Sequence, residues 1–472
     1  MRNRDTFRAA LCAFLILDAL SSVRAETLAG ALIRAYNANP SLNSARAGLR
    51  AKDESVPQAL AGARPRVSVD GLLGTQRRRD VQDSIEFDNN DPTSRRFVES
   101  IQSGPGTPRS AALSIEQPIL DIFKTQSAAG AAESSVFAER ARLRLMEQRL
   151  LLEAVTAYMN VLRDTAAFKL QESNVAVLGE QLRQDRERYL AGQITPTDVA
   201  QAESRLAAGR SQVAAARAAL EASMGVYKQL IGVEPKRLDS AAPVDRLLPK
   251  TREDAERLAQ NEHPVIIAAM YDIDAADLDI RVRESDFMPK LSVVGNVFTN
   301  AQVDGRGSHN LGASVMGKLS APIYEGGQTS SRVRQAKELA GQRRLDLDVA
   351  RAEVLALVRA NWAAFIATKT QVSSSQAQAA AAERALMGVR EEAKAGQRTT
   401  LDILNAQQEL LGARVALLSA QRDRVIASYA VLSATGRLSA EVLGLGVSRY
   451  DPTVHFDQVK DSWGGVSVPD FP

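Results

Sequence analysis

Two very long stretches of the chain keep a helical pattern of apolar and polar positions without a proline. The first runs from about Phe123 to Ala191, and the second from about Gly327 to Ala395. At about 1.5 Å per residue, each predicts roughly 100 Å of helix, which is too long for an ordinary globular domain. Shorter helical stretches follow at about 196–231 and 400–435. The pattern therefore predicts two long helical hairpins.

The turns of the two predicted hairpins have nearly the same sequence. Both 191–202 and 395–406 fit A-G-Q-x-T-x-x-D-[V/I]-x-x-A. The glycine supplies the left-handed residue that ends the incoming helix. The threonine and the aspartate three residues later form a capping box that starts the outgoing helix. These residues are Gly192, Thr195 and Asp198 in the first turn and Gly396, Thr399 and Asp402 in the second.

The matching turns belong to an internal duplication. Gly192 and Gly396 are 204 residues apart (396 − 192), and Pro118 and Pro322 keep the same offset. A repeat of this length indicates one structural unit that is used twice. Upstream the offset rises to 224, so the first copy has 20 extra residues (224 − 204) before Pro118. The predicted organisation is a first repeat at 26–232, a linker at 233–249, a second repeat at 250–436 and a tail at 437–472.

Four shorter stretches change to the two-residue period of a β-strand, with apolar residues on one face. They lie within 65–75, 111–118, 291–297 and 311–319, and predict strand hairpins at about 65–119 and 289–323. Between the first two strands, 76–108 is polar and charged, which predicts an exposed loop. A short loop is expected at 300–310.

The strands have the length, about 9–11 residues, that is needed to cross a bilayer at a steep tilt. The same alternation also fits two ordinary hairpins in a soluble α+β protein. If the strands cross a membrane, four of them cannot close a barrel, and an open sheet edge is not tolerated in lipid. Several chains then share one barrel: two chains give eight strands and three give twelve, and the pattern does not choose between them.

The N-terminal residues 1–25 have the features of a cleaved secretory signal. Three early arginines precede an apolar run at 9–17, and the only cysteine, Cys12, lies inside this segment. No lipoprotein-type small residues precede Cys12, so we expect no lipid anchor. Four arginines and two aspartates leave with the signal, and the remainder has 55 basic and 54 acidic residues. This near neutrality argues against nucleic acid as a partner. No later stretch approaches 18 apolar residues without a charge, so no transmembrane helix is predicted.

The residues needed for catalysis or for metal binding are sparse. The three histidines, His263, His309 and His455, are scattered among a helix break, a strand loop and the tail. After signal removal there is no cysteine to complete a metal site, and no histidine lies near a plausible serine nucleophile. We therefore expect neither an enzyme nor a cofactor.

Together, the duplication, the turn motif and the paired strands resemble the TolC family of outer-membrane efflux and type I secretion channels. The resemblance covers about 26–436, and its most specific parts are 395–406, the matching turn around Asp198, and the Arg64-Pro65-Arg66 entry into a strand. It implies a mostly α chain with transmembrane β structure. Three chains would form one 12-stranded β-barrel, four strands per chain, in outer-membrane lipid, continued by a long α-helical tunnel through the periplasm.

The resemblance also implies partners and a place for them. A periplasmic adaptor (membrane fusion) protein and an inner-membrane transporter would dock on this homotrimer at the helix-turn tips. In this chain the tips contain Gly192, Thr195, Gly396 and Thr399. The exported cargo and the identity of the partners stay open.

A gate at the tips is implied as well. By motif, Arg398 would bridge to Thr197 and Asp198, and Asp402 would point into the aperture as a ring of acids. In the family a second acid contributes to that ring, but this chain has Asn405 at the corresponding position, so three chains would contribute three acids rather than six. The family's best-known members also have a tyrosine that makes a second link, and this chain has Ala393 there. These departures predict a tip that is more weakly closed and less sensitive to cations.

Helix capping alone also explains the paired threonines and aspartates of the turns. Arg398 differs, because a turn needs no arginine and the first repeat has Ile194 at that position. This asymmetry favours a specific partner for Arg398.

The alternative function is that of a soluble periplasmic coiled-coil adaptor or scaffold. Such an adaptor normally has one helical hairpin flanked by β-rich segments, whereas this sequence predicts two hairpins and only four strands. A passive outer-membrane channel therefore fits the pattern better.

Overall fold

The computed structural model describes residues 25–88, 91–303 and 308–468. The predicted signal, including Cys12, lies outside the described residues except for Ala25, and the last four residues of the predicted tail lie outside them too. The described chain divides into two compact units. The helical unit comprises 25–51, 137–270 and 345–452, and the sheet unit comprises the described parts of 52–136, 271–344 and 453–468.

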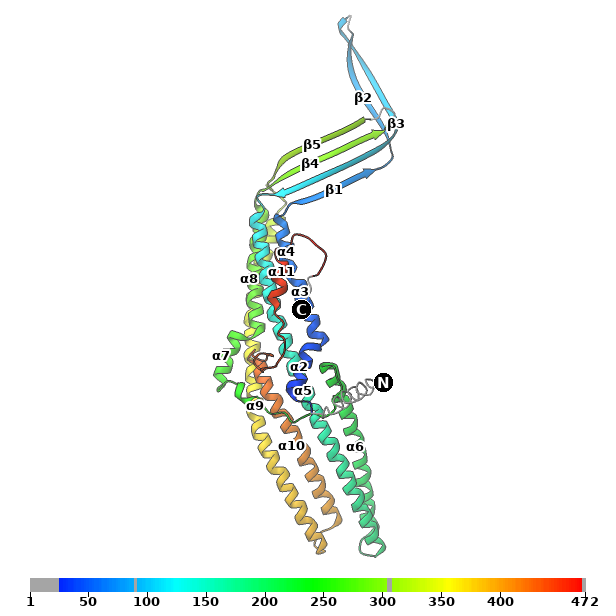
Figure 1. Cartoon of the computed structure of the whole chain (residues 1–472), viewed down its shortest axis with the longest axis vertical. Helices are drawn as coiled ribbons and strands as arrows, with labels where there is room; N and C mark the ends of the chain where they lie inside the picture. Colours follow the sequence, from blue (N-terminus) through cyan, green and yellow to red (C-terminus); the bar gives the residue numbers. More distant parts are fainter. Residues whose placement is uncertain (1–24, 89–90, 304–307, 469–472) are drawn as a thin grey trace, which may run out of the picture. The chain divides into compact units, whose positions relative to one another are not determined.

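Two long helical hairpins dominate the chain, as the sequence predicts (Figure 1). Helix α5 (Ile122–Leu190, 69 residues) turns into α6 (Pro196–Ile231). Helix α9 (Gln328–Lys394, 67 residues) turns into α10 (Thr400–Ala434). These bounds agree with the predicted ones to within a residue, because a long helical period ended by a glycine and restarted by a cap is a strong local signal.

Shorter helices precede each hairpin, and a proline interrupts them at the same place in both repeats. The first repeat has α2 (Leu28–Ala38), α3 (Pro40–Asp53) and α4 (Ser55–Leu60), and the second has α7 (Arg252–Glu262) and α8 (Pro264–Glu284). Short 3₁₀ turns lie at η2 (Ala61–Ala63), η3 (Asp245–Leu247) and η4 (Ser285–Phe287).

The residue before each of these prolines caps the helix that the proline begins. The Oδ1 atom of Asn39 accepts from the backbone N–H of Ser41 at 2.9 Å. In the second repeat, the Nδ1 atom of His263 accepts from the N–H of Val265 at 3.3 Å. Burial lowers the pKa of His263 to about 4, so the ring stays neutral and keeps this acceptor. The role of His263 is therefore structural.

The core of the helical unit gathers around two buried tyrosines. Tyr158 and Tyr227, on α5 and α6, are fully buried, and their ring centroids are 6.3 Å apart. The hydroxyl of Tyr158 donates to the carbonyl oxygens of Glu26 at 2.7 Å and Asp239 at 2.8 Å. A parallel bridge between Glu26 and Leu238 lies beside these bonds. The start of the first repeat and the 233–249 linker are thus fastened to the same helix.

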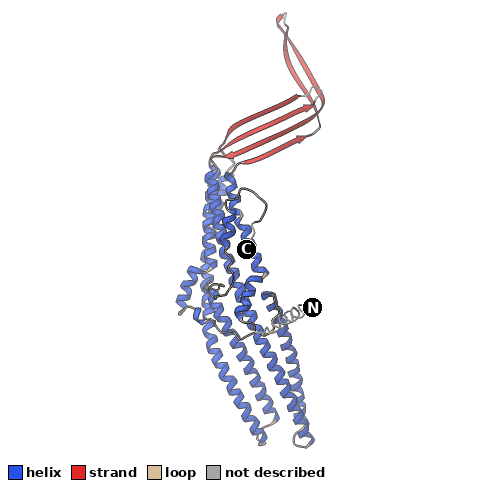
Figure 2. Ribbon diagram, in the orientation of Figure 1, coloured by secondary structure: helices blue, strands red, loops and turns tan. Residues whose placement is uncertain are grey.

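All five strands belong to the sheet unit (Figure 2). They are β1 (Arg66–Leu73), β2 (Gln76–Asp88), β3 (Asp91–Pro118), β4 (Lys290–Val303) and β5 (Ser308–Ser320). The order is β1-β3-β4-β5, all antiparallel, and β2 pairs with the other part of β3. Among the described strands, β1 pairs only with β3 and β5 only with β4, so each has one edge without a partner strand.

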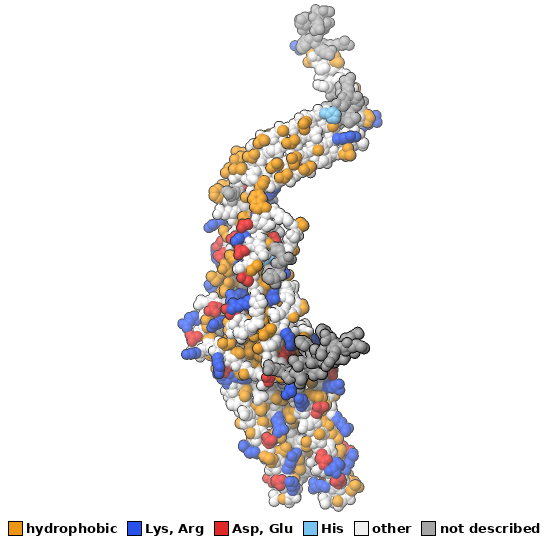
Figure 3. All heavy atoms as spheres, viewed as in Figure 1, with side chains coloured by type: hydrophobic (Ala, Val, Ile, Leu, Met, Phe, Trp, Pro, Cys, Tyr) orange, Lys and Arg blue, Asp and Glu red, His pale blue; other side chains and the backbone are white. Residues whose placement is uncertain are grey.

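The sheet has one apolar face and one polar face, as the sequence predicts. The register puts Val69, Leu113, Val297 and Ala313 in one row across the four strands. Val69 is 74% exposed and Val315, on the same face, is 80% exposed. Figure 3 shows hydrophobic side chains gathered over the sheet. An apolar face this exposed is typical of a surface that a membrane or another protein covers.

The predicted loop at 76–108 is wrong, because these residues form the long β2–β3 hairpin. Its register pairs Val81 with Ile101 and Ile85 with Phe97, four residues apart on the same face. A two-stranded ribbon whose two faces both lie outside a core needs few apolar residues, so its polar composition is compatible with a loop and with strands. Strands β4 and β5 likewise extend into the short loop predicted at 300–310.

The tail is not entirely irregular. It contains α11 (Pro452–Val459), which belongs to the sheet unit. There the Nδ1 atom of His455 lies 2.9 Å from Oδ2 of Asp53, and both side chains are buried. Of the helices in the described parts of the chain, none is both long and apolar enough to cross a bilayer.

We predict that Tyr158→Phe destabilises the helical unit by roughly 1–3 kcal/mol, because two buried carbonyl oxygens lose their donor. Urea unfolding of the detergent-purified protein, followed by circular dichroism, measures this loss as a lower midpoint. Tyr189→Phe is the matched control, since Tyr189 is 44% exposed. Equal midpoints for both variants would show that the hydroxyl does not hold the linker.

Candidate functional site: the hairpin tips

Each hairpin reverses at a glycine in the left-handed region, as predicted. The φ angle is +72° at Gly192 and +78° at Gly396. In both turns the glycine N–H donates to the carbonyl three residues earlier, at 2.9 Å and 3.1 Å. The next N–H, of Gln193 or Gln397, donates to the carbonyl five residues earlier at 2.9 Å. These bonds satisfy the last carbonyls of the incoming helix, and a side chain with a Cβ would be strained at either glycine.

A complete capping box starts each outgoing helix. In the first, Oδ2 of Asp198 accepts from the N–H of Thr195 at 2.9 Å, and the N–H of Asp198 donates to the Thr195 hydroxyl. Thr399 and Asp402 repeat the arrangement, also with 2.9 Å between the Thr399 N–H and Oδ2. The bonds from the threonine backbone lower the pKa of both aspartates, so both are anionic at neutral pH.

Arg398 is held by its own hairpin. Its Nε donates to Oε2 of Glu392 at 2.8 Å, which raises the pKa of Arg398. Both side chains are about half exposed, so this pair orients the guanidinium more than it stabilises the fold. Within the described chain no contact joins Arg398 to Thr197 or Asp198, and the gate link stays a prediction.

Asn405 takes part in a seam that joins the two hairpins of one chain. Its Oδ1 accepts from Nη2 of Arg205, on α6, at 3.0 Å. One residue earlier, Leu404 is 3% exposed and packs in the same cluster as Leu178 and Leu182 of α5. The structure therefore gives Asn405 a partner on the other hairpin, and its place in the aperture stays a prediction.

Further along the seam, Nε2 of Gln407 donates to Oδ1 of the buried Asn174 at 3.3 Å. Sequence reasoning missed this seam, because its partners are about 200 residues apart. One signal was present: Arg205 matches Glu409 in the second repeat, a reversal of charge at equivalent positions (409 − 204).

The tips offer helix ends and polar side chains but little reactive chemistry. Among the described residues, no group of three or more His, Cys, Asp or Glu side chains is arranged to hold a metal ion. The aspartates are occupied with helix caps, and the arginine with a glutamate. Such a surface can bind another helical surface or contact another copy of itself.

Comparison with known proteins assigns the chain to a family. A family model described as outer membrane efflux protein matches 32–232 and 257–437, two segments that overlap the two predicted repeats. The chain belongs to the outer membrane efflux protein family. The TolC resemblance is thereby confirmed, and TolC of Escherichia coli (strain K12) is 24% identical over 71% of this chain and 70% of its own length.

The outer membrane efflux protein BepC of Brucella suis biovar 1 (strain 1330) is 38% identical over 94% of this chain and 93% of its own length. Among solved structures, the Campylobacter jejuni CmeC outer membrane channel matches with a TM-score of 0.73, at 17% identity, over 92% of this chain and 89% of that one. The efflux family protein described here is thus an outer-membrane channel component of the efflux and type I secretion class. The soluble adaptor or scaffold is not supported.

We predict that Thr399→Ala loosens the start of α10 in this efflux family protein by about 1 kcal/mol, because the helix loses its N-cap acceptor. Hydrogen exchange of the amides of Asp402 and Ile403, which bond to Thr399, should be roughly fivefold faster at neutral pH. Thr399→Ser is the matched control, since it keeps the hydroxyl. Equal exchange in the alanine and serine variants would contradict a capping role.

Proposed function

We propose that this protein is the passive exit duct of a tripartite efflux pump or a type I secretion system. In this proposal it spans the outer membrane as a homotrimer and continues as a helical tunnel through the periplasm. It catalyses no reaction, and an inner-membrane transporter supplies the energy. A periplasmic adaptor protein docks at the hairpin tips around Gly192, Thr195, Gly396 and Thr399.

The observation that carries the proposal is the open sheet with its exposed apolar face. Strands β1 and β5 each pair on one side only among the described strands. A sheet whose apolar face lies in lipid must satisfy the backbone groups of both edges. Copies of the same chain supply the missing partners, β1 of one against β5 of the next. Three copies, the number implied by the TolC resemblance, give twelve strands from β1, β3, β4 and β5, with β2 outside this set, and twelve long helices.

The gate is proposed at the second tip. Arg398, in the turn between α9 and α10, reaches Thr197 and Asp198 of a neighbouring hairpin, and the Asp402 carboxylates surround the aperture. Two observations support this arrangement: Arg398 has no counterpart in the first turn, and both aspartates stay ionised because their caps lower their pKa values.

We predict that Arg398→Ala increases single-channel conductance in a planar bilayer, because three latches are lost at once. The wild-type protein should give small steps, and the variant larger ones. Lys394→Ala is the matched control: Lys394 is a cation beside the same turn, and it pairs within its own helix with Glu391 at 2.7 Å. Equal steps in all three proteins would keep the channel and discard the Arg398 latch. The channel itself fails if none conducts and all are soluble without detergent.

The single ring of acids predicts weak block by hexamminecobalt. We expect Asn405→Asp, which adds a second acid per chain, to lower the blocking concentration by roughly tenfold or more, since the field of a ring grows with its charge. Conductance at a fixed salt concentration measures this, with Gln408→Asp as a control on the same helix. Unchanged block in Asn405→Asp would place residue 405 outside the aperture.

A further inference from the structure

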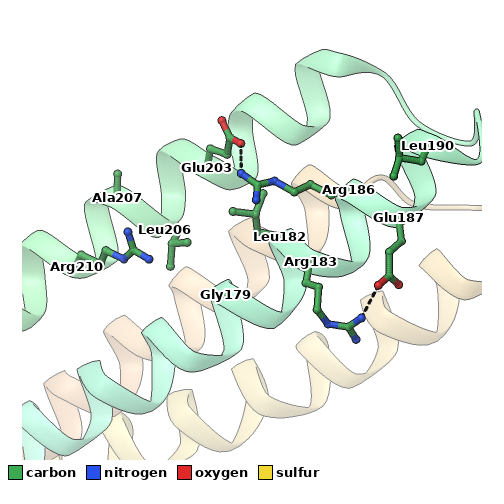
Figure 4. Close-up of a pocket in the computed structure, with 10 residues that line it drawn as sticks. All are labelled: Gly179, Leu182, Arg183, Arg186, Glu187, Leu190, Glu203, Leu206, Ala207 and Arg210. Carbon is green, nitrogen blue, oxygen red and sulfur yellow. Dashed lines mark hydrogen bonds and ion pairs between the residues drawn. The ribbon is translucent and has the colours of Figure 1, made fainter.

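The two hairpins carry the same groove. In the first hairpin it lies between α5 and α6, near the tip (Figure 4). In the second it lies between α9 and α10. Matching residues line both at the 204-residue offset of the duplication: Leu182 and Leu386, Arg186 and Arg390, Leu206 and Leu410. Both grooves are thus products of one repeated unit.

The inner polar contact of the groove is also repeated. Nη2 of Arg186 lies 2.6 Å from Oε1 of Glu203, as Figure 4 shows. At the equivalent place, Nη2 of Arg390 donates to Oε1 of Gln407 at 3.0 Å. The arginine therefore fixes its partner side chain across the mouth of each groove.

The groove of the second hairpin is occupied by the first hairpin of the same chain. Four residues on one face of α5 complete its lining: Leu170, Ser173, Asn174 and Val177. The buried Asn174 accepts from Gln407, the side chain that Arg390 holds. The remaining volume is about 350 Å³.

The groove of the first hairpin has no such occupant. The residues that line it come only from α5 and α6, and its volume is about 550 Å³. The occupant that the duplication predicts is found by adding 204 to the α5 positions. These residues of α9 are Ser374, Ala377, Gln378 and Ala381, and all four are exposed.

We propose that the α5–α6 groove of one copy receives residues 374–381 of α9 from a second copy, with Gln378 of that copy bonded to Glu203. The proposal rests on the homotrimer of the proposed function and specifies which surfaces meet and in which register. Gln378 brings an amide donor to the carboxylate that Arg186 holds. The small side chains at 374, 377 and 381 allow the two helices to approach closely.

A second pair of positions supports the same register. In the chain, Arg205 of α6 donates to Asn405 of α10. At the 204-residue offset, Asn405 corresponds to Gln201 and Arg205 corresponds to Glu409. The equivalent contact between copies therefore joins Gln201 of one copy to Glu409 of the next, again an amide donor opposite a carboxylate. Complementary partners thus arise at both polar positions of the seam.

The geometry closes a ring. Within a chain the second hairpin contacts the first, and between copies the first contacts the second of the next chain. This head-to-tail contact uses two different surfaces, and it forms a closed ring when the rotation at each joint matches. Because the joints inside and between chains are built from equivalent residues, their rotations are equivalent.

Thiol cross-linking tests the register. We use the full-length protein with Cys12→Ser, purified in detergent, and a short bis-maleimide. In Glu203→Cys/Gln378→Cys, we expect most of the protein to move from the band of a single chain to bands of two and three linked chains on a denaturing gel. Each single variant should stay at one-chain mass.

Two controls define the result. Asn174→Cys/Gln407→Cys has the equivalent contact inside one chain, so it should react and stay at one-chain mass. Glu203→Cys/Gln371→Cys moves the second thiol by seven residues along α9, about 10 Å, and should not react.

The outcomes separate the two proposals. The first outcome is that Glu203→Cys/Gln378→Cys stays at one-chain mass while Asn174→Cys/Gln407→Cys reacts. If light scattering then still gives trimers, and these conduct in a planar bilayer, the register is overturned and the exit duct stands. Equal reaction at 203/371 also overturns the register. If light scattering gives single chains, both proposals fail.

Discussion

The unpaired edges of the sheet are the constraint on which the rest of the molecule depends. A backbone N–H or C=O left without a partner in the hydrocarbon region costs several kcal/mol, and a strand edge has a row of them. In the described sheet, β1 and β5 each leave such an edge, and an apolar face lies beside them. Neither edge can be satisfied within the described sheet, so the fold is incomplete as a single chain. The strand edges therefore require further copies of the chain, and the helices of those copies must pack together as well.

The duplication decides how the helices meet that requirement. One unit used twice gives each hairpin the same groove and the same surface for filling a groove. Inside the chain, one groove is filled by Asn174 and its neighbours, and one remains open. Functional differences must then come from positions where the repeats diverge. Arg398 against Ile194, and Arg205 against Glu409, are such positions, and both lie at or near the tips.

The sequence predicts features that are set by neighbouring residues and misses those set by distant ones. The long helices, Gly192, Gly396 and both capping boxes follow from period and local chemistry, and the structure has them. The apolar face of the sheet follows from simple alternation. The β2–β3 hairpin was missed because a ribbon with two solvated faces has no burial pattern to detect. The contacts of the seam, such as Gln407 with Asn174, join residues whose distance in sequence hides them.

The roles of the tip residues require a finer distinction, because capping and gating use the same side chains. Oδ2 of Asp198 already accepts from Thr195, and that bond keeps the carboxylate ionised. Arg398 is likewise already bonded, to Glu392. A link between Arg398 and Asp198 of a neighbouring hairpin therefore adds little net free energy, because it exchanges one exposed ion pair for another. In the proposed gate, three weak links of this kind hold the tip closed until a partner docks. The cap bonds do not break in this proposed exchange, so the helix ends stay intact whether or not the links form.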